Sequence, residues 1–121
     1  MNPVNWFEIP VSDMYRAKDF YEFIFDLTLE IHESPFLFTA WFPMDDKAPG
    51  AGGALVQTVS FTPARDGVLI YFSVEDIEAT LKKIMEKGGT LLQPKTAIGE
   101  YGFIGYFLDS EGNRIGLHSK A

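Results

Sequence analysis

The sequence predicts an α+β fold built from two copies of one strand–helix–strand–strand–strand module. Three observations support this prediction. The segments Phe7–Met14 and Ile70–Ile77 read alike and lie 63 residues apart. Each segment continues into apolar residues at helical spacing, and each expected helix is followed by three strand-like segments. A ferredoxin-like sandwich needs only four strands, so the eight strands expected here favour the two-copy plan.

Each module begins with a strand that runs into the acidic start of a helix. Asp13 and Asp76 stand at these starts, where a carboxylate interacts favourably with the positive end of the helix dipole. The glycine pair Gly88–Gly89 predicts the end of the second helix. The apolar faces comprise Met14, Ala17, Phe20, Tyr21 and Ile24 in the first helix, and Ile77, Leu81, Ile84 and Met85 in the second.

The rest of each module is predicted to form strands. We expect a single domain, residues 1–121, with a first module at about 3–60 and a second at about 66–121. Val68–Val74 and Phe103–Leu108 are almost wholly apolar, which predicts strands covered on both faces. Besides Val68–Val74, the expected strands are Leu27–Glu33, Phe36–Met44 and Gly52–Thr58, followed by Thr90–Gln93, Phe103–Asp109 and Arg114–His118.

Composition excludes several classes of function. The chain has 121 residues and no cysteine, which rules out disulfides, thiolate nucleophiles and Cys-based metal sites. The net charge of −7 and the lack of a basic cluster argue against nucleic-acid binding. No apolar run approaches the length of a membrane span, and the N-terminus has no signal-like segment. We therefore expect a cytoplasmic protein that binds neither nucleic acid nor membrane.

Particular segments resemble the vicinal-oxygen-chelate superfamily of glyoxalase I, extradiol dioxygenases and bleomycin-resistance proteins. They are Trp6–Asp13 with Phe20–Glu22, Tyr71–Ile77 and Leu108–Ser119, while Gln93–Gly102 is similar to the link of a glyoxalase-related subfamily whose members are mostly unassigned. The resemblance implies two βαβββ modules that form one curved mixed sheet around a cleft, with helices on the outer face. Such a sheet leaves open edges that a second copy can cover, so we expect a homodimer.

The resemblance also indicates where the metal ligands of the family would fall. The first-strand positions lie seven residues before Asp13 and Asp76, and the last-strand position of the second module is where glyoxalases keep Glu. The repeat length gives its partner in the first module. These four positions are Trp6, Gly53, Leu69 and Gly116. None has a side chain that can bind a divalent cation, so we expect no metal or other cofactor unless the ligands are relocated.

Strand alternation adds further candidates for the cleft. Side chains two residues along from these positions share their face, which selects Glu8, Leu55, Tyr71 and His118, with Gln57 next. Glu8 beside Trp6 could be desolvated, which would raise its pKa toward the range of a general base. The alternative places Glu8 at the wet rim of an edge strand.

The two histidines and one loop leave alternatives open. His118 either pairs with Glu8 as acid and base, or as a displaced metal pair, or is a hydrogen-bonded structural residue. His32 is expected to be a solvated surface residue. Glu100 and Tyr101 precede a strand at the expected mouth of the cleft, where they could contact a ligand or only form a turn.

Aromatic residues supply the remaining clue to function. Most of the following set are expected in the core: Trp6, Phe36, Phe38, Trp41, Phe42, Tyr71, Phe103 and Tyr106. A cleft without metal ligands but with Trp and Tyr suits a flat or partly apolar small molecule. Its expected ligand-binding residues are Trp6, Gln57, Tyr71, Glu100 and Tyr101.

Two main functions follow from these patterns. The first is a metal-free binding protein of the bleomycin-resistance type, which holds an aromatic or conjugated molecule in the cleft. The second is a glyoxalase-related lyase, isomerase or dioxygenase that uses relocated ligands or acid–base residues such as Glu8 and His118. A third possibility is a regulatory module without turnover. The sequence does not name a substrate.

Overall fold

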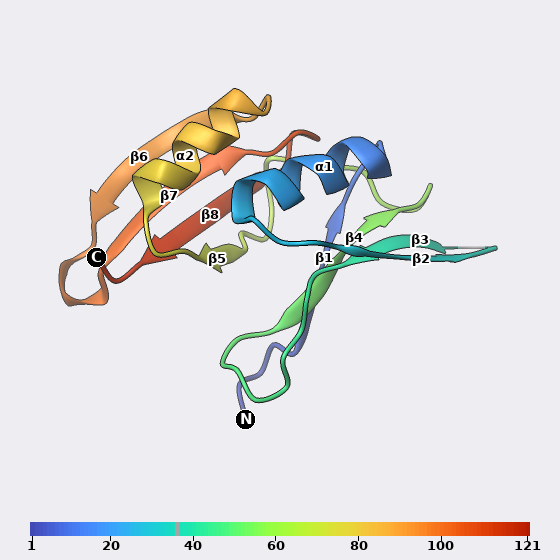
Figure 1. Ribbon diagram of the computed structural model, residues 1–121, viewed down its shortest axis with the longest axis horizontal. Helices are drawn as coiled ribbons and strands as arrows, with labels where there is room; N and C mark the ends of the chain where they lie inside the picture. The colour runs from blue at the N-terminus through green and yellow to red at the C-terminus, as the bar shows by residue number, and fades with distance from the viewer. Residues whose placement is uncertain (36) are drawn as a thin grey trace.

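The computed structural model describes residues 1–35 and 37–121 and has two βαβββ modules (Figure 1). Module 1 comprises β1 (Trp6–Pro10), α1 (Met14–Phe25), β2 (Glu30–Ser34), β3 (Leu37–Trp41) and β4 (Gly52–Gln57). Module 2 comprises β5 (Tyr71–Ser73), α2 (Ile77–Glu86), β6 (Thr90–Ala97), the short helix η1 (Gly99–Tyr101), β7 (Phe103–Leu108) and β8 (Arg114–Ser119). The predicted α+β class is confirmed. In the part of the chain that is described, no helix is long and apolar enough to cross a bilayer.

Strand pairing is the same in both modules. β1 pairs in parallel with β4, and β5 pairs in parallel with β8. The strand orders are β1-β4-β3-β2 and β5-β8-β7-β6, with antiparallel pairing in the rest of each sheet. The curved sheet is therefore hydrogen-bonded as two four-stranded halves, whose edge strands β1 and β5 both border a cleft between the modules.

Both helices begin at the predicted aspartates. The Asp13 side chain accepts a hydrogen bond from the backbone N–H of Arg16, and the Asp76 side chain accepts one from that of Ala79. These bonds satisfy backbone donors that the first turn of a helix leaves unpaired. At the other end of α2, Gly88 has a φ of +95°, a left-handed conformation that only glycine adopts without strain.

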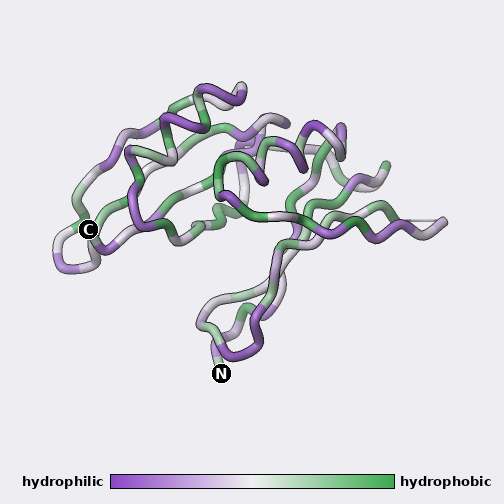
Figure 2. The backbone as a smooth tube through the Cα atoms, viewed as in Figure 1, coloured by the Kyte–Doolittle hydropathy of each residue, from purple (hydrophilic) through white to green (hydrophobic). Residues whose placement is uncertain are grey.

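The core lies between the two helices and one face of each sheet (Figure 1). All five residues of the predicted apolar face of α1 are buried, and the tube of Figure 2 alternates between hydrophilic and hydrophobic residues along both helices. In α2 the prediction for Met85 is wrong, because Met85 is 50% exposed and Thr80 is buried instead.

Strand β5 is shorter than predicted. The strand covers Tyr71–Ser73 of the expected Val68–Val74, with single hydrogen bonds that join Ile70 and Val74 to β8 on either side, and Val68 is 92% exposed. The prediction that this segment is covered on both faces is therefore wrong. Its apolar residues instead border the cleft between the modules, where Leu69 and Ile70 are half-buried. Phe36, the expected start of another strand, lies outside the described residues.

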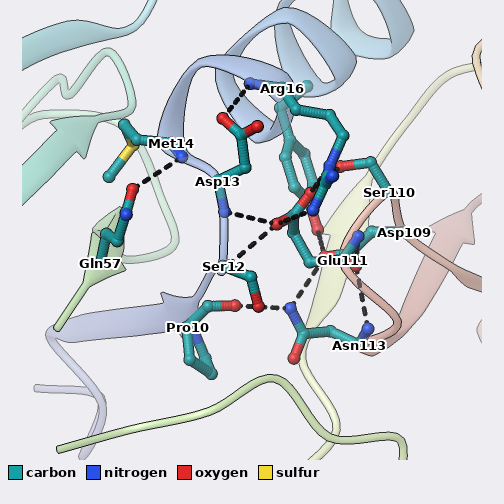
Figure 3. Close-up of polar contacts among 11 residues, drawn as sticks. Pro10, Ser12, Asp13, Met14, Arg16, Gln57, Asp109, Ser110, Glu111 and Asn113 are labelled. Atoms are coloured by element: carbon teal, nitrogen blue, oxygen red, sulfur yellow. Dashed lines mark hydrogen bonds and ion pairs between the residues drawn. The ribbon is translucent and has the colours of Figure 1, made fainter. Parts of the chain in front are cut away.

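A buried carboxylate in the turn between β7 and β8 joins the modules (Figure 3). Asp109 is 4% exposed and accepts the Tyr21 hydroxyl of α1 at 2.6 Å. It also accepts the backbone N–H groups of Glu111 and Asn113, both at 2.9 Å, and the Asn113 amide at 3.1 Å. The Asn113 amide reaches the Pro10 carbonyl at 2.7 Å, so the same turn holds the end of β1.

A second carboxylate of this turn completes the start of α1 (Figure 3). Glu111 Oε1 accepts the backbone N–H groups of Ser12 and Asp13 at 2.9 and 2.8 Å. Its oxygens also accept the guanidinium of Arg16 at 2.7 and 2.9 Å. Burial raises the pKa of Glu111, but the hydrogen bonds from Arg16, Asp13, Ser110 and Ser12 outweigh it and the pKa is lowered. Module 2 therefore fixes the orientation of the first helix of module 1.

Candidate functional site

Each sheet has one face toward the helices and one face away from them, which we call its open face. In module 1, Ile9 and Leu55 are paired and buried in the core, so Trp6 and Glu8 lie on the open face. In module 2, Leu117 lies in the core, which places its neighbours Gly116 and His118 on the open face. The open faces carry most of the predicted site residues.

Three hollows meet at Glu8. The inter-module cleft has a volume of about 1100 Å³ and is bordered by Trp6 and Tyr71. A second hollow of about 480 Å³ lies on the open face of module 1 between Trp6 and Trp41. A third, of about 190 Å³, extends from Glu8 to Arg114. Glu8 borders all three and is exposed, so the structure matches the wet-rim alternative and removes the burial argument for a general base.

The open face of module 1 presents two indoles. The rings of Trp6 and Trp41 are 5.2 Å apart and inclined at 70°. Trp6 Nε1 donates to Glu8 Oε2 at 3.4 Å, and Trp41 Nε1 donates to Thr39 Oγ1 at 3.1 Å. His32 is exposed, as expected, and its ring also stacks on Trp41 with the ring centroids 4.2 Å apart. His32 lies on the edge strand β2, opposite Thr39 of β3. Thr39 and Trp41 are two residues apart on β3, so the rings of His32 and Trp41 share this face.

The open face of module 2 presents two tyrosines and an arginine. The hydroxyls of Tyr71 and Tyr106 are 2.8 Å apart. This hydrogen bond, with burial, raises the pKa of Tyr71 to about 12, so Tyr71 stays protonated at neutral pH. Arg114 Nε is buried and has no hydrogen-bond acceptor among the described residues. Sequence reasoning missed Arg114, although it lies two residues before Gly116 on one strand and so shares its face.

His118 is held by the loop that was expected at the cleft mouth. Its Nε2 lies 2.6 Å from the carbonyl oxygen of Tyr101. A carbonyl can only accept, so Nε2 carries the proton and Nδ1 is the nitrogen left for other chemistry. Glu100 and Tyr101 lie in η1 and are exposed. His118 borders none of the three hollows that meet at Glu8, so the structure does not bring the expected acid–base pair together.

Three expected cleft residues of module 1 face the helices instead. Leu55 is fully buried in the core, and Gln57 Oε1 accepts the backbone N–H of Met14 at 2.8 Å. Gly53 lies under the ring of Phe7, on the same core side. The structural counterpart of Gly116 is Ala54, because Glu8 pairs with Ala54 as Tyr71 pairs with Gly116. The whole segment between the paired residues is one residue longer in module 1 than in module 2, which shifts the register and reverses the face.

The residues at the corrected positions do not fit the metal of the family. Trp6, Ala54, Leu69 and Gly116 offer no imidazole nitrogen, carboxylate or thiolate. A Cβ added at Gly116 would lie 2.6 Å from the ring of Tyr71, which fills the space that a ligating side chain would need. Within residues 1–35 and 37–121, no group of three or more His, Cys, Asp or Glu side chains could hold a metal ion.

The aromatic set is divided between the two faces. Phe42 is buried in the core, and Phe38 and Phe103 pack against it. The expectation that most of the set lies in the core is wrong, because four of the seven described members lie on the open faces: Trp6, Trp41, Tyr71 and Tyr106. Phe36 lies outside the described residues.

Comparisons with known proteins agree with this architecture. A domain from Frankia sp. EAN1pec, described as a glyoxylase/bleomycin resistance protein/dioxygenase domain, superposes with a TM-score of 0.75 at 17% identity, covering 98% of both chains. A glyoxalase-related enzyme from Fulvimarina pelagi gives 0.72 at 16% identity, covering 98% of this chain and 88% of the other. A variant of glyoxalase I from Zea mays gives 0.72 at 19% identity, covering 98% and 46%. These similarities show the fold.

Sequence comparison identifies the family. "Putative glyoxylase CFP32" of Mycobacterium bovis is 26% identical over 128 residues, covering 93% of this chain. The protein of the same name from Mycobacterium tuberculosis matches equally well, and the chain spans 44% of the length of each. The model of the Glyoxalase/Bleomycin resistance protein/Dioxygenase superfamily matches residues 4–117. The chain therefore belongs to the glyoxalase/bleomycin resistance protein/dioxygenase superfamily.

Proposed function

We propose that this protein binds a small, flat organic molecule without the help of a metal, in the manner of a bleomycin-resistance protein. The observation that carries the proposal is that aromatic rings occupy the open faces at positions where the family has metal ligands. The ring of Tyr71 fills the space above Gly116, and Trp6 stands at the equivalent of a first-strand ligand. Aromatic walls suit an aromatic or conjugated molecule, which gains stacking as well as apolar contact.

The inter-module cleft is the proposed place of binding. Its volume of about 1100 Å³ exceeds what one small ligand fills, and both edge strands border it. β1 and β5 each present one unpaired edge in this structure, so we propose that the binding unit is a homodimer in which a second copy covers part of the opening. Sedimentation at micromolar concentration tests this, and a monomer alone would contradict it. The cytoplasmic location stays a prediction.

The ligand prediction concerns Trp6. In a fluorescence-monitored screen of flat organic compounds, a ligand that enters the cleft should change tryptophan emission, with Trp41 as background. Stacking on the indole contributes about 1 kcal/mol beyond the buried area. Trp6→Leu should therefore weaken the best ligand several-fold, while the unfolding midpoint changes little because Leu69 already occupies the repeat-equivalent position. An unchanged affinity together with an unchanged fold would disprove the role of Trp6.

The metal prediction follows from the donor set. Isothermal titration calorimetry should detect no stoichiometric binding of nickel, zinc, iron or manganese to protein purified without a His tag. Trp6, Ala54, Leu69 and Gly116 offer no donor atoms. Sub-micromolar affinity that is abolished by Glu8→Gln or His118→Ala would overturn the metal-free proposal.

A second candidate function is a glyoxalase-related lyase, isomerase or dioxygenase. His118 is the observation that favours it, because the Tyr101 carbonyl fixes one ring nitrogen and leaves Nδ1 available as a base. Glu8 and His118 would have to act on different parts of a substrate, since they border no common hollow. Metal binding through these two residues would promote this candidate over the first.

A further inference from the structure

We propose that the hollow bordered by both Trp6 and Trp41, here called the indole hollow, selects a flat organic cation over a neutral molecule of the same shape. The proposal rests on the proposed function, because it assigns the chemical class of the ligand to one wall of the same site. The indole hollow has a volume of about 480 Å³ and is lined by β1, β2 and β3 of module 1. Its selectivity follows from its rings and its charges.

The two indoles form a corner. Their planes are inclined at 70° with centroids 5.2 Å apart, so a ligand that lies against one ring has the other at its edge. The N–H groups of both are already engaged, by Glu8 and by Thr39. What remains for a ligand is the part of each ring face that His32 and the neighbouring indole leave uncovered. Trp is the aromatic residue that attracts a cation most strongly. Trp41 is 39% exposed, so its ring is accessible.

The charges around the corner have one sign. The Glu8 carboxylate lines the indole hollow, and none of the lining residues is Lys or Arg. The lining residue His32 is paired with Glu30 of the same strand at 3.2 Å. The Trp6 N–H holds the Glu8 carboxylate beside the ring, at 3.4 Å. Arg114 borders the small hollow on the other side of Glu8, but the ion pairs of the described residues do not include Glu8. The carboxylate is thus left to face a ligand, in a protein of net charge −7.

A cation and a neutral isostere would gain different interactions here. Both gain contact with the rings, and both displace water from apolar surface. Only the cation gains the attraction of the ring faces and of the Glu8 carboxylate, which add because they act on the same charge. An aromatic ring alone would favour any flat molecule, and a carboxylate alone would favour any cation. Their juxtaposition favours a flat cation, such as a quaternised heteroaromatic ring or an aromatic amidine.

The test compares 1-methylquinolinium with 4-methylquinoline by isothermal titration calorimetry, at a pH where the second compound is uncharged. The wild-type protein should bind the cation at least tenfold more tightly, and added salt should reduce the difference. Glu8→Gln should cut this preference to about threefold or less while leaving the affinity for 4-methylquinoline unchanged. Trp41→Leu should weaken both compounds.

The control variant is Glu86→Gln, which removes the same charge from an exposed residue at the end of α2. It should keep the full preference, and thermal unfolding of each variant should show that the fold is intact. Equal affinities for the two compounds, a preference that survives Glu8→Gln, or no binding of the cation would overturn the inference. If the neutral compound still binds and Trp6→Leu weakens it, the proposed binding function stands and only the selectivity for a cation fails.

Discussion

Replacing Asp109 with alanine should lower the free energy of unfolding by about 3–5 kcal/mol, the cost of breaking a buried polar network around a charge. Asp109 is 4% exposed and accepts four hydrogen bonds. Alanine would leave the buried hydroxyl of Tyr21 without its acceptor and release two backbone N–H groups of the turn. The loss is a large part of the stability of a domain of this size, which is about 5–15 kcal/mol.

Urea unfolding followed by circular dichroism measures the effect. Tyr21→Phe is the matched comparison, because it removes one donor and leaves the other three in place. It should cost about 1–2 kcal/mol, as one buried hydrogen bond to a charged group does. A cost below about 1 kcal/mol for Asp109→Ala would show that the network does not join the modules energetically.

Glu111→Gln should produce a stability difference that depends on pH. At neutral pH we expect a loss of about 1–3 kcal/mol, because the carboxylate holds backbone donors of α1 and the guanidinium of Arg16. The expected loss of stability is not larger because the side chain of Arg16 is 54% exposed and water screens its ion pair with Glu111. Glutamine keeps the shape of Glu111 and removes its charge.

The direction of the pH dependence follows from the lowered pKa of Glu111. A carboxyl group whose pKa is lower in the folded state binds protons more readily when unfolded. Its contribution is therefore complete above its ordinary value of 4.5 and is lost as the pH falls through the lower folded value. The stability difference between wild type and Glu111→Gln should be constant near neutral pH and shrink below 4.5.

Urea unfolding of both proteins at neutral pH and at about pH 3 measures this difference. Burial raises the pKa of Asp109, partly offset by hydrogen bonds from Tyr21 and Asn113, so Asp109 changes stability with pH in the opposite direction. Asp109 is present in both proteins and largely cancels in the comparison. Glu86→Gln, an exposed control, should match wild type throughout. A difference that widens in acid would contradict the role of Glu111.

Local patterns predicted the modules well, because their causes are local. Asp13 and Asp76 cap helices through bonds to residues three positions along, and the apolar spacing of α1 marks the face that is buried. The prediction for strand β5 was wrong because its apolar residues border a cleft, and hydropathy alone does not distinguish the wall of a cleft from a sheet covered on both faces. The same ambiguity put open-face rings such as Trp41 and Tyr106 in the expected core.

The site was predicted in part. Trp6, Glu8 and Tyr71 border the inter-module cleft as expected. Their places on the strands were counted back from the capping aspartates Asp13 and Asp76, and strand alternation fixes the face on which their side chains lie. Gln57 was misplaced, because the segment from Glu8 to its partner Ala54 is one residue longer than the segment from Tyr71 to Gly116, which shifts the register of β4. Glu111 reads as an ordinary turn residue, and its contact with Ser12 spans 99 positions, which no local pattern encodes.

The ring of Tyr71 above Gly116 also limits how this protein can evolve. A mutation of Gly116 to glutamate would introduce the residue that glyoxalases have at this position, but its side chain would meet the ring of Tyr71. Tyr71 would have to change first, and that mutation would remove part of the aromatic wall before a metal site could form. Ala54, Leu69 and Trp6 would then each need further mutations. The metal site of glyoxalases is thus separated from the present sequence by several mutations, and one of them removes part of the aromatic wall.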